Sequence, residues 1–136
     1  MLRDARLGKE VVITVTNKIG VLADISKILA DHGMNIDAVA GYALEDGTAK
    51  IMLAAEDPQR VVDALKKANY KSIKENEVVI VELENKTGAL KFLTAKLAQE
   101  NIDIKQVYGS TCTGSCAARL VLSTTDNEKA LVTFRK

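Results

Sequence analysis

The sequence contains two copies of one pattern, and this repeat limits what the chain can fold into. Residues 11 to 65 align with residues 79 to 133 at an offset of 68, without a gap. The best-matched part is Asn-Lys-Ile-Gly-Val-Leu at 17–22, which recurs as Asn-Lys-Thr-Gly-Ala-Leu at 85–90. In each copy this segment follows an apolar run and precedes an amphipathic stretch. A repeat of this period predicts two supersecondary units with the same fold and equivalent sites.

The hydrophobic pattern of the first copy predicts a strand, a helix and a hairpin in that order. Residues 11–16 are β-branched throughout, which is typical of a strand. From residue 21 to residue 29 the apolar side chains gather on one side of a helix, and Gly33 is placed to end that helix. The pair Asp46-Gly47 lies between two further apolar runs and therefore predicts a hairpin.

A second helix and a fourth strand complete the first copy. Asp57-Pro58 opens the helix, because proline is tolerated at the first helical positions, and Tyr70 to Lys74 is expected to form a short strand. The order β-α-β-β-α-β predicts an α+β fold of two tandem ferredoxin-like modules, each with its helices on one face of an antiparallel sheet. The expected modules are residues 9–76 and 77–136.

The second copy stops before its last strand. At the common offset Lys136 matches Ala68, where the fourth strand of the first copy is still to come. One solution is that residues 2–7 supply the strand, since the same offset places them where a fourth strand would lie. The alternatives are that residues 132–135 leave the helix early as a stunted strand, or that the sheet edge is left for a partner chain.

Composition excludes several classes of partner. The chain is 47% hydrophobic and 27% charged, as in an ordinary globular protein, and its net charge is +1. This charge gives no reason to expect nucleic acid or an anionic membrane as a partner. The N-terminus lacks the apolar core of a signal peptide, and no run approaches the length of a membrane span. We therefore expect a cytoplasmic protein.

The repeated segments resemble the signature of the ACT domain, a small regulatory module that binds amino acids. The resemblance rests on residues 17–25 and 29–36, and residues 85–90 and 97–104 repeat it, so that it covers nearly the whole chain. The sequence departs from the family at Ile19 and Thr87, where the family often has proline; this loosens the loop but removes no binding group. The resemblance implies a non-catalytic, amino-acid-binding regulatory protein that needs no cofactor.

The ACT resemblance also implies a site at each glycine turn. Gly20 and Gly88 fall between the first strand and the first helix of their copies, where the missing side chain lets a ligand approach the backbone. The next N–H groups are unpaired helix donors that suit an α-carboxylate. Asn35 and Asp103, at the start of the second strand, offer oxygen atoms to an α-ammonium group.

These residues also have simpler roles. Asn17 and Asn85 could bind the ligand from the same loops, but an asparagine before a glycine turn often caps its own backbone. Asn35 and Asp103 could equally complete a helix-to-strand loop. ACT ligands usually sit where two modules meet, so Gly20 would face Asp103 and Gly88 would face Asn35, within one chain or across a dimer. The expected ligand-binding residues are Asn17, Lys18, Ile19, Gly20, Val21, Leu22, Asn35, Ile36, Asn85, Thr87, Gly88, Ala89, Leu90, Asp103 and Ile104.

The sequence gives little support for a catalytic site or a metal site. His32 is the only histidine, so neither a Ser/His/Asp nor a Cys/His set can be assembled, and no phosphate-binding loop follows a strand. Cys112 and Cys116 are too few for a disulfide framework and lack two further ligands for a structural zinc. We expect them to be small residues in a crowded turn, with metal or redox sensing as the alternative.

The resulting hypothesis is a sensor, or the regulatory subunit of a separately encoded enzyme of amino-acid metabolism. Its expected partners are an amino acid or similar small zwitterion and a second copy of the chain in a homodimer. The alternative is a structural or interaction protein without a ligand, whose sheet edges pair with a partner.

Overall fold

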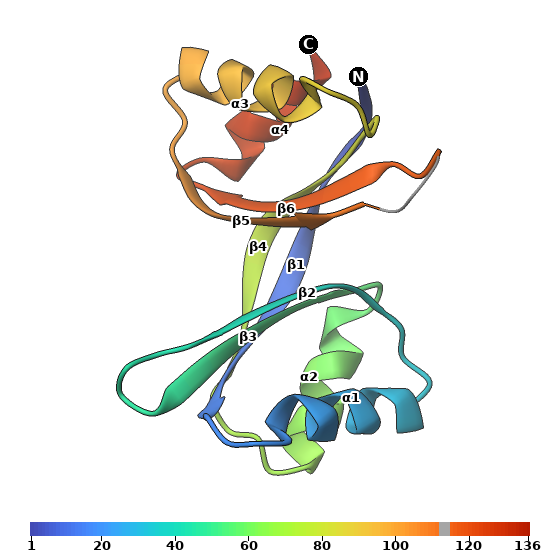
Figure 1. The fold of residues 1–136 in the computed structure, drawn as a ribbon, viewed down its shortest axis with the longest axis vertical. Helices are drawn as coiled ribbons and strands as arrows, with labels where there is room; N and C mark the ends of the chain where they lie inside the picture. Colours follow the sequence, from blue (N-terminus) through green and yellow to red (C-terminus); the bar gives the residue numbers. More distant parts are fainter. Residues whose placement is uncertain (112–114) are drawn as a thin grey trace. The chain divides into compact units, whose positions relative to one another are not determined.

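The protein is described from a computed structural model that covers residues 1–111 and 115–136. Ten elements form its secondary structure in the described part of the chain (Figure 1): β1 (Leu2–Thr16), α1 (Val21–Asp31), β2 (Ile36–Ala43), β3 (Thr48–Ala55), α2 (Pro58–Lys67), β4 (Ile73–Leu83), α3 (Ala89–Gln99), β5 (Ile104–Ser110), β6 (Ala118–Thr124) and α4 (Asn127–Arg135). The strand order is β2-β3-β1-β4-β6-β5. The chain divides into two compact units, Lys9–Asn76 and Met1–Gly8 with Glu77–Lys136.

The unit Lys9–Asn76 has the element order β-α-β-β-α-β with an antiparallel sheet. β1 pairs with β3 and β3 pairs with β2, both antiparallel, and α1 and α2 lie on one face of these strands. Alternate residues of β1 point toward the helices, as the β-branched pattern predicts. The buried core comprises Val11, Ile13, Val15, Ile25, Leu29, Ala49, Ile51, Leu53, Val61, Val62, Ala64 and Leu65.

Capping hydrogen bonds fix the C-terminal end of α1 and the N-terminal end of α2 at the residues that the sequence predicts. Gly33 has φ 69°, its N–H donates to Ala30 O at 2.9 Å, and Met34 N–H donates to Leu29 O at 2.9 Å. This pair of bonds satisfies the last carbonyls of α1 and needs a left-handed residue. Asp57 caps α2 by accepting the N–H of Arg60 at 3.2 Å.

The other unit takes its outer strand from the N-terminus of the chain. Ala5 of β1 is buried in the same hydrophobic core as Phe134. Arg135 Nη2 donates to Ala5 O at 2.9 Å, and Glu84 N–H donates to Met1 O at 2.8 Å. The expectation of a stunted strand at residues 132–135 is wrong, because α4 continues to Arg135.

The strand pairing corrects the gapless alignment of the two copies. Val11 pairs with Leu53, whereas its counterpart Val79 pairs with Leu122. The offset is therefore 68 for the first three elements and 69 from β6 onward, since Leu53 and Leu122 are 69 residues apart. The second copy has one additional residue between β5 and β6, and Ala49 corresponds to Ala118 rather than to residue 117.

Two pairs of segments that were expected to be separate strands each form one continuous strand. Of the predicted fourth strand at residues 70–74, only Ile73 and Lys74 are in a strand, and they form the start of β4, which continues into the first strand of the second copy. Residues 2–16 form the single strand β1. No glycine or proline interrupts β4. Gly8 lies inside β1, where a Cβ atom would come within 2.7 Å of Ile80 Cδ1. A close packing contact, and not a turn, thus explains this glycine.

The cysteine segment falls partly outside the described residues. Cys116 is disulfide-bonded, which differs from the expected pair of small turn residues, and Cys112 lies outside the described part of the chain. Among the described residues no helix is long and apolar enough to cross a membrane.

Candidate functional site

The turn at Gly20 presents two helix N–H groups that α1 itself leaves without an acceptor. Gly20 has φ 91° and is the N-cap of α1 without a side-chain capping bond. Val21 N–H donates to Lys18 O at 3.3 Å, and Asp24 N–H donates to Gly20 O at 2.9 Å. Between them, the N–H groups of Leu22 and Ala23 belong to the first helical turn, where no preceding helical carbonyl exists. These donors lie at the end of the helix that favours negative charge.

Neighbouring loops hold this turn in place. Tyr70 donates its hydroxyl to the Asp24 carboxylate in the first turn of α1. Burial and this hydrogen bond raise the pKa of Tyr70 to about 12, because both disfavour the phenolate. Asn17 N–H donates to Gly47 O of the β2–β3 hairpin at 2.9 Å. The turn is thus anchored on two sides.

An apolar groove of about 320 Å³ adjoins the Gly20 turn. Leu22, Val39 and Tyr42 are about half exposed there, at 49%, 52% and 50%. The groove is lined by Asn17, Val21, Leu22, Val39, Ala40, Gly41, Tyr42, Ala43, Ala49 and Ile51. Ile19 does not line it and is fully exposed at the tip of the turn.

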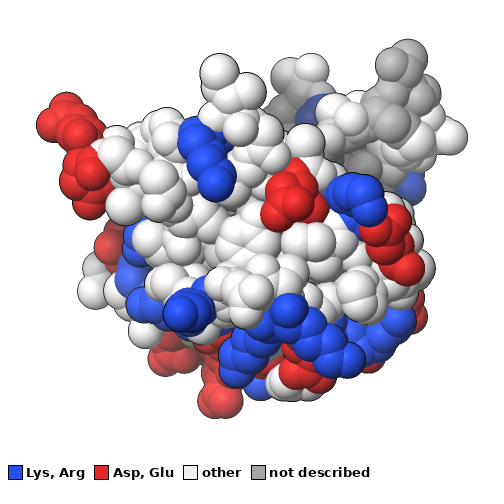
Figure 2. All heavy atoms as spheres, turned by 90° about the horizontal axis from the view of Figure 1, so that it is seen from below, with Lys and Arg blue, Asp and Glu red and all other residues white. Residues whose placement is uncertain are grey.

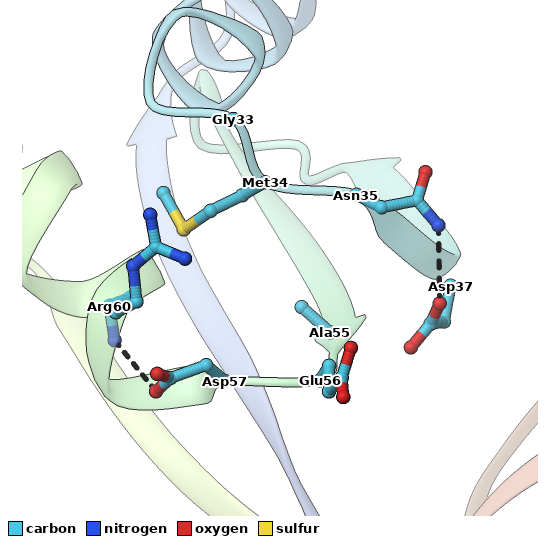
Figure 3. A pocket seen from close by; sticks show the side chains of 8 residues that line it. All are labelled: Gly33, Met34, Asn35, Asp37, Ala55, Glu56, Asp57 and Arg60. Atoms are coloured by element: carbon cyan, nitrogen blue, oxygen red, sulfur yellow. Dashed lines mark hydrogen bonds between the residues drawn. The ribbon is translucent and has the colours of Figure 1, made fainter.

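A charged pocket of about 460 Å³ lies at the opposite end of α1 (Figure 3). Its lining is Gly33, Met34, Asn35, Asp37, Ala55, Glu56, Asp57 and Arg60. The guanidinium of Arg60 is fixed by a 2.9 Å hydrogen bond from Nη2 to His32 O. Asn35 Nδ2 donates to Asp37 Oδ1 at 3.4 Å on the other side of the pocket.

The structure does not bring Gly20 and Asn35 together within one unit. Gly20 precedes α1 and Asn35 follows it, and an 11-residue helix is about 16 Å long. Ile36 begins β2 and packs against the core. Of the predicted residues of the first copy, the apolar groove is lined by Asn17, Val21 and Leu22 and the charged pocket by Asn35, whereas neither is lined by Lys18, Ile19, Gly20 or Ile36.

The turn at Gly88 repeats the geometry at Gly20. Gly88 has φ 88° and caps α3 without a side-chain bond, and Ala89 N–H donates to Lys86 O at 3.2 Å. Leu90, the counterpart of Leu22, is 55% exposed, whereas Ala89 is buried. Asn85 and Thr87 belong to the same exposed loop.

The second copy differs at the end that corresponds to the charged pocket. Asp103 N–H donates to Thr125 Oγ1 at 3.1 Å, and Thr125 N–H donates to Asp103 O at 3.0 Å. These bonds join the loop before β5 to the loop after β6, and Ile104 then begins β5. At the corresponding place in the first copy no hydrogen bond joins Asn35 to Glu56, both of which are described.

Sequence reasoning missed Tyr42 in the groove and the charged residues Asp37, Glu56 and Arg60 in the pocket. The repeat contains a signal for Arg60, since Lys129 occupies the equivalent position and its Nζ donates to Glu100 O at 2.9 Å. That equivalence requires the offset of 69 and is hidden by a gapless alignment.

The face shown in Figure 2 carries charges of both signs. Figure 2 shows the face that carries α1 and α2, where Lys and Arg side chains alternate with Asp and Glu around an uncharged centre. Within residues 1–111 and 115–136, no group of three or more His, Cys, Asp or Glu side chains is arranged to hold a metal ion.

Comparison with known proteins gives a family match for the first copy. Residues 11–72 match the family described as the AHAS small subunit-like ACT domain. No curated protein matches the chain in sequence.

Solved structures share the fold over most of the chain. Protein BT0572 from Bacteroides thetaiotaomicron has a TM-score of 0.86 at 23% identity, covering 96% of this chain and 88% of that one. The regulatory subunit of aspartate kinase from Thermus thermophilus, in a ligand-free form, has a TM-score of 0.68 at 11% identity, covering 98% of this chain and 96% of that one. Aspartokinase alpha and beta subunits give 0.64 at 16% identity, covering 99% and 97%. At these identities the likeness shows the fold alone.

Proposed function

Because residues 11–72 belong to the ACT domain family, we propose that the protein is a non-catalytic regulatory protein that binds an amino acid or similar small zwitterion. We also propose that both copies are ACT-like modules, residues 9–76 and residues 77–136 completed by residues 2–7. ACT domains are regulatory modules, and the solved structures with this fold include a protein named as a regulatory subunit.

The observation that carries the proposal is the repeated glycine turn. Gly20 and Gly88 adopt φ 91° and φ 88° and leave α1 and α3 without a side-chain cap. Glycine at the N-cap supplies no side-chain acceptor for the helix N–H groups, at a cost of only about a few tenths of a kcal/mol relative to Ser, Thr, Asp or Asn. The caps of α2 and α4, by contrast, are Asp57 and Asp126. A turn that stays uncapped in both copies suits the docking of a ligand carboxylate.

The ligand would contact residues of two protein chains. The α-carboxylate docks on the N–H groups of Leu22 and Ala23, and its side chain lies in the apolar groove. The α-ammonium group also needs an oxygen atom, and Asn35 of the same unit lies at the far end of α1. We propose that a second copy of the chain supplies it in a homodimer, through its Asn35 or Asp103.

Regulation follows from binding across such an interface. A ligand held by two protein copies stabilises their association by its differential affinity for the associated state. The protein would report the concentration of the ligand to a separately encoded enzyme of amino-acid metabolism in the cytoplasm.

A thermal-shift screen of the twenty amino acids tests the proposal. At millimolar ligand, about 100 times a dissociation constant of about 10 μM, binding adds about 2.7 kcal/mol to the free energy of unfolding and raises Tm by several degrees. The variant Leu22→Asp places a like charge beside the docked carboxylate and should remove the shift, while Val132→Asp, at an exposed site in α4, should keep it. A folded, dimeric protein that responds to no amino acid would contradict the proposal and favour a structural or interaction role.

A further inference from the structure

We infer that Leu120 restricts the glycine turn of the second copy to amino acids with a small side chain, glycine or alanine. Ile51, at the equivalent position of the first copy, leaves room for a larger apolar side chain. This inference rests on the proposed function and adds which amino acids each turn accepts. Its basis is the different packing of these two residues against a pair of equivalent glycines.

The two turns have the same apolar neighbours. Leu22 and Val39 line the groove beside the first turn and are about half exposed. At the offset of 68 they recur as Leu90 and Val107, which are again about half exposed. These shared side chains give no reason for the two turns to prefer different ligands.

A glycine follows each of these valines on the same face of its strand. Gly41 comes two residues after Val39 and lines the groove, and its equivalent is Gly109 in β5. Gly41 pairs with Ile51 of β3, whereas Gly109 pairs with Leu120 of β6. Residues that pair directly across two strands lie side by side on one face of the sheet. Ile51 and Leu120 therefore decide how much space remains over the two glycines.

The space over the glycine is open in the first copy and occupied in the second. A Cβ atom added to Gly41 would lie 3.6 Å from Ile51 Cγ1, which is an ordinary contact. A Cβ atom added to Gly109 would lie 2.3 Å from Leu120 Cδ2. Leucine branches one carbon farther from the backbone than isoleucine, so that its methyl group reaches over the opposite glycine. Leu120 also packs against the core of its unit, so moving it aside would remove apolar contacts.

This difference sets the size of the ligand side chain. An amino acid whose α-carboxylate docks on the helix N–H groups of the second turn would direct its side chain toward Leu120. Glycine and alanine place no more than a methyl group there, whereas a branched side chain would have to displace Leu120. At the same place the first copy has the groove of about 320 Å³. Hydrophobic pockets distinguish side chains that differ by one methylene by about tenfold or more.

An NMR titration of the isotope-labelled full chain with glycine and L-isoleucine tests the inference. The backbone amide signals of Leu22 and Ala23 report the first turn, and those of Leu90 and Lys91, at the same positions of α3, report the second. We expect L-isoleucine to move the first-turn signals at a concentration about tenfold below that needed for the second-turn signals. Glycine should move both sets of signals at similar concentrations.

Exchanging the two residue types separates the effect of Leu120 from the other differences between the copies. Leu120→Ile should lower the concentration of L-isoleucine that moves the second-turn signals about tenfold, and Ile51→Leu should raise it about tenfold at the first turn. Exchanges between leucine and isoleucine conserve volume, so both variants should fold. Leu131→Ile makes the same change at another position that packs against the core of the unit containing Leu120, and it should alter neither response.

The possible results separate this inference from the proposed function. Equal responses of both turns to L-isoleucine, or no response of the second turn to glycine, would overturn the inference and leave amino-acid binding at the first turn standing. A folded Leu120→Ile variant with an unchanged second-turn response would overturn the role of Leu120. A first turn that responds to another amino acid but not to L-isoleucine would overturn the preference for a larger apolar side chain. If none of the twenty amino acids moves the signals of either turn, the proposed function fails together with the inference.

Discussion

The two copies agree at one end of their first helix and differ at the other. Gly20 and Gly88 form the same uncapped left-handed turn. At the other end the first copy opens into a charged pocket, whereas Asp103 and Thr125 join the corresponding loops of the second copy. The two copies thus share the turn, where backbone N–H groups are presented, and differ at the end that side chains line. Two sites of different specificity are the expected result.

The largest effect should come from breaking the strand that the N-terminus supplies. Ala5→Asp buries a carboxylate at a position that is 4% exposed in the core of the unit Met1–Gly8 with Glu77–Lys136. We expect a loss of about 3 kcal/mol or more in the free energy of unfolding of that unit. Hydrogen exchange should show the loss of protection in α3 and α4 before α1 and α2. Equal loss in both units would contradict the assignment of residues 1–8.

The glycine turns should respond to the same substitution in the same way. Gly20→Ala and Gly88→Ala each place a Cβ atom in open space but at φ near 90°, so the cost is backbone strain of about 1–2 kcal/mol. Gly20→Asn should cost less, because asparagine tolerates the left-handed region. Chemical denaturation measures all three variants. A cost for Gly20→Ala far above that for Gly88→Ala would mean that the turns are not equivalent.

Removing a hydrogen bond between Asp103 and Thr125 in the second copy should lower the free energy of unfolding by a smaller amount. Thr125→Val keeps the shape of the side chain and removes the acceptor for Asp103 N–H, which should cost about 1 kcal/mol. Its counterpart Glu56→Gln removes no bond between the loops and should stay within about 0.5 kcal/mol of the wild type. Urea unfolding compares the two, and similar costs would argue against the difference between open and closed loops.

A pH dependence is expected at the anchor of the Gly20 turn. The pKa of Tyr70 is raised from 10.0 to about 12, so the unfolded chain releases this proton at a lower pH than the folded one. The stabilisation is complete below pH 10 and is lost as the pH rises toward about 12. Tyr70→Phe should flatten the fall in the free energy of unfolding over this window. An unchanged slope would exclude the contact of Tyr70 with Asp24.

The sequence predicted the elements that depend on local chemistry. Gly33 ends α1 and Asp57 caps α2, as their residue types require. The repeat also predicted that Gly88 would copy Gly20. These features could be read from the sequence because each depends on a few neighbouring residues.

Features that depend on pairing between distant segments could not be predicted in the same way. The additional residue before β6 is evident only from the pairing of Val79 with Leu122. Because a gapless alignment does not allow for this residue, it does not match Arg60 with Lys129. The continuity of β4 follows from packing on both sides of the expected break. The charged pocket arises where two loops fail to meet, which no local pattern in either loop specifies.

An NMR titration of the isotope-labelled full chain with amino acids tests the central claim most directly. The account predicts that at least one amino acid shifts the backbone amide signals of Leu22 and Ala23, whose N–H groups face the proposed carboxylate. Signals of the α2 start, where Asp57 already caps the helix, provide the internal control for the groove site. A spectrum of a folded protein in which no amino acid at millimolar concentration moves the Leu22 and Ala23 signals would contradict ligand binding at the glycine turn.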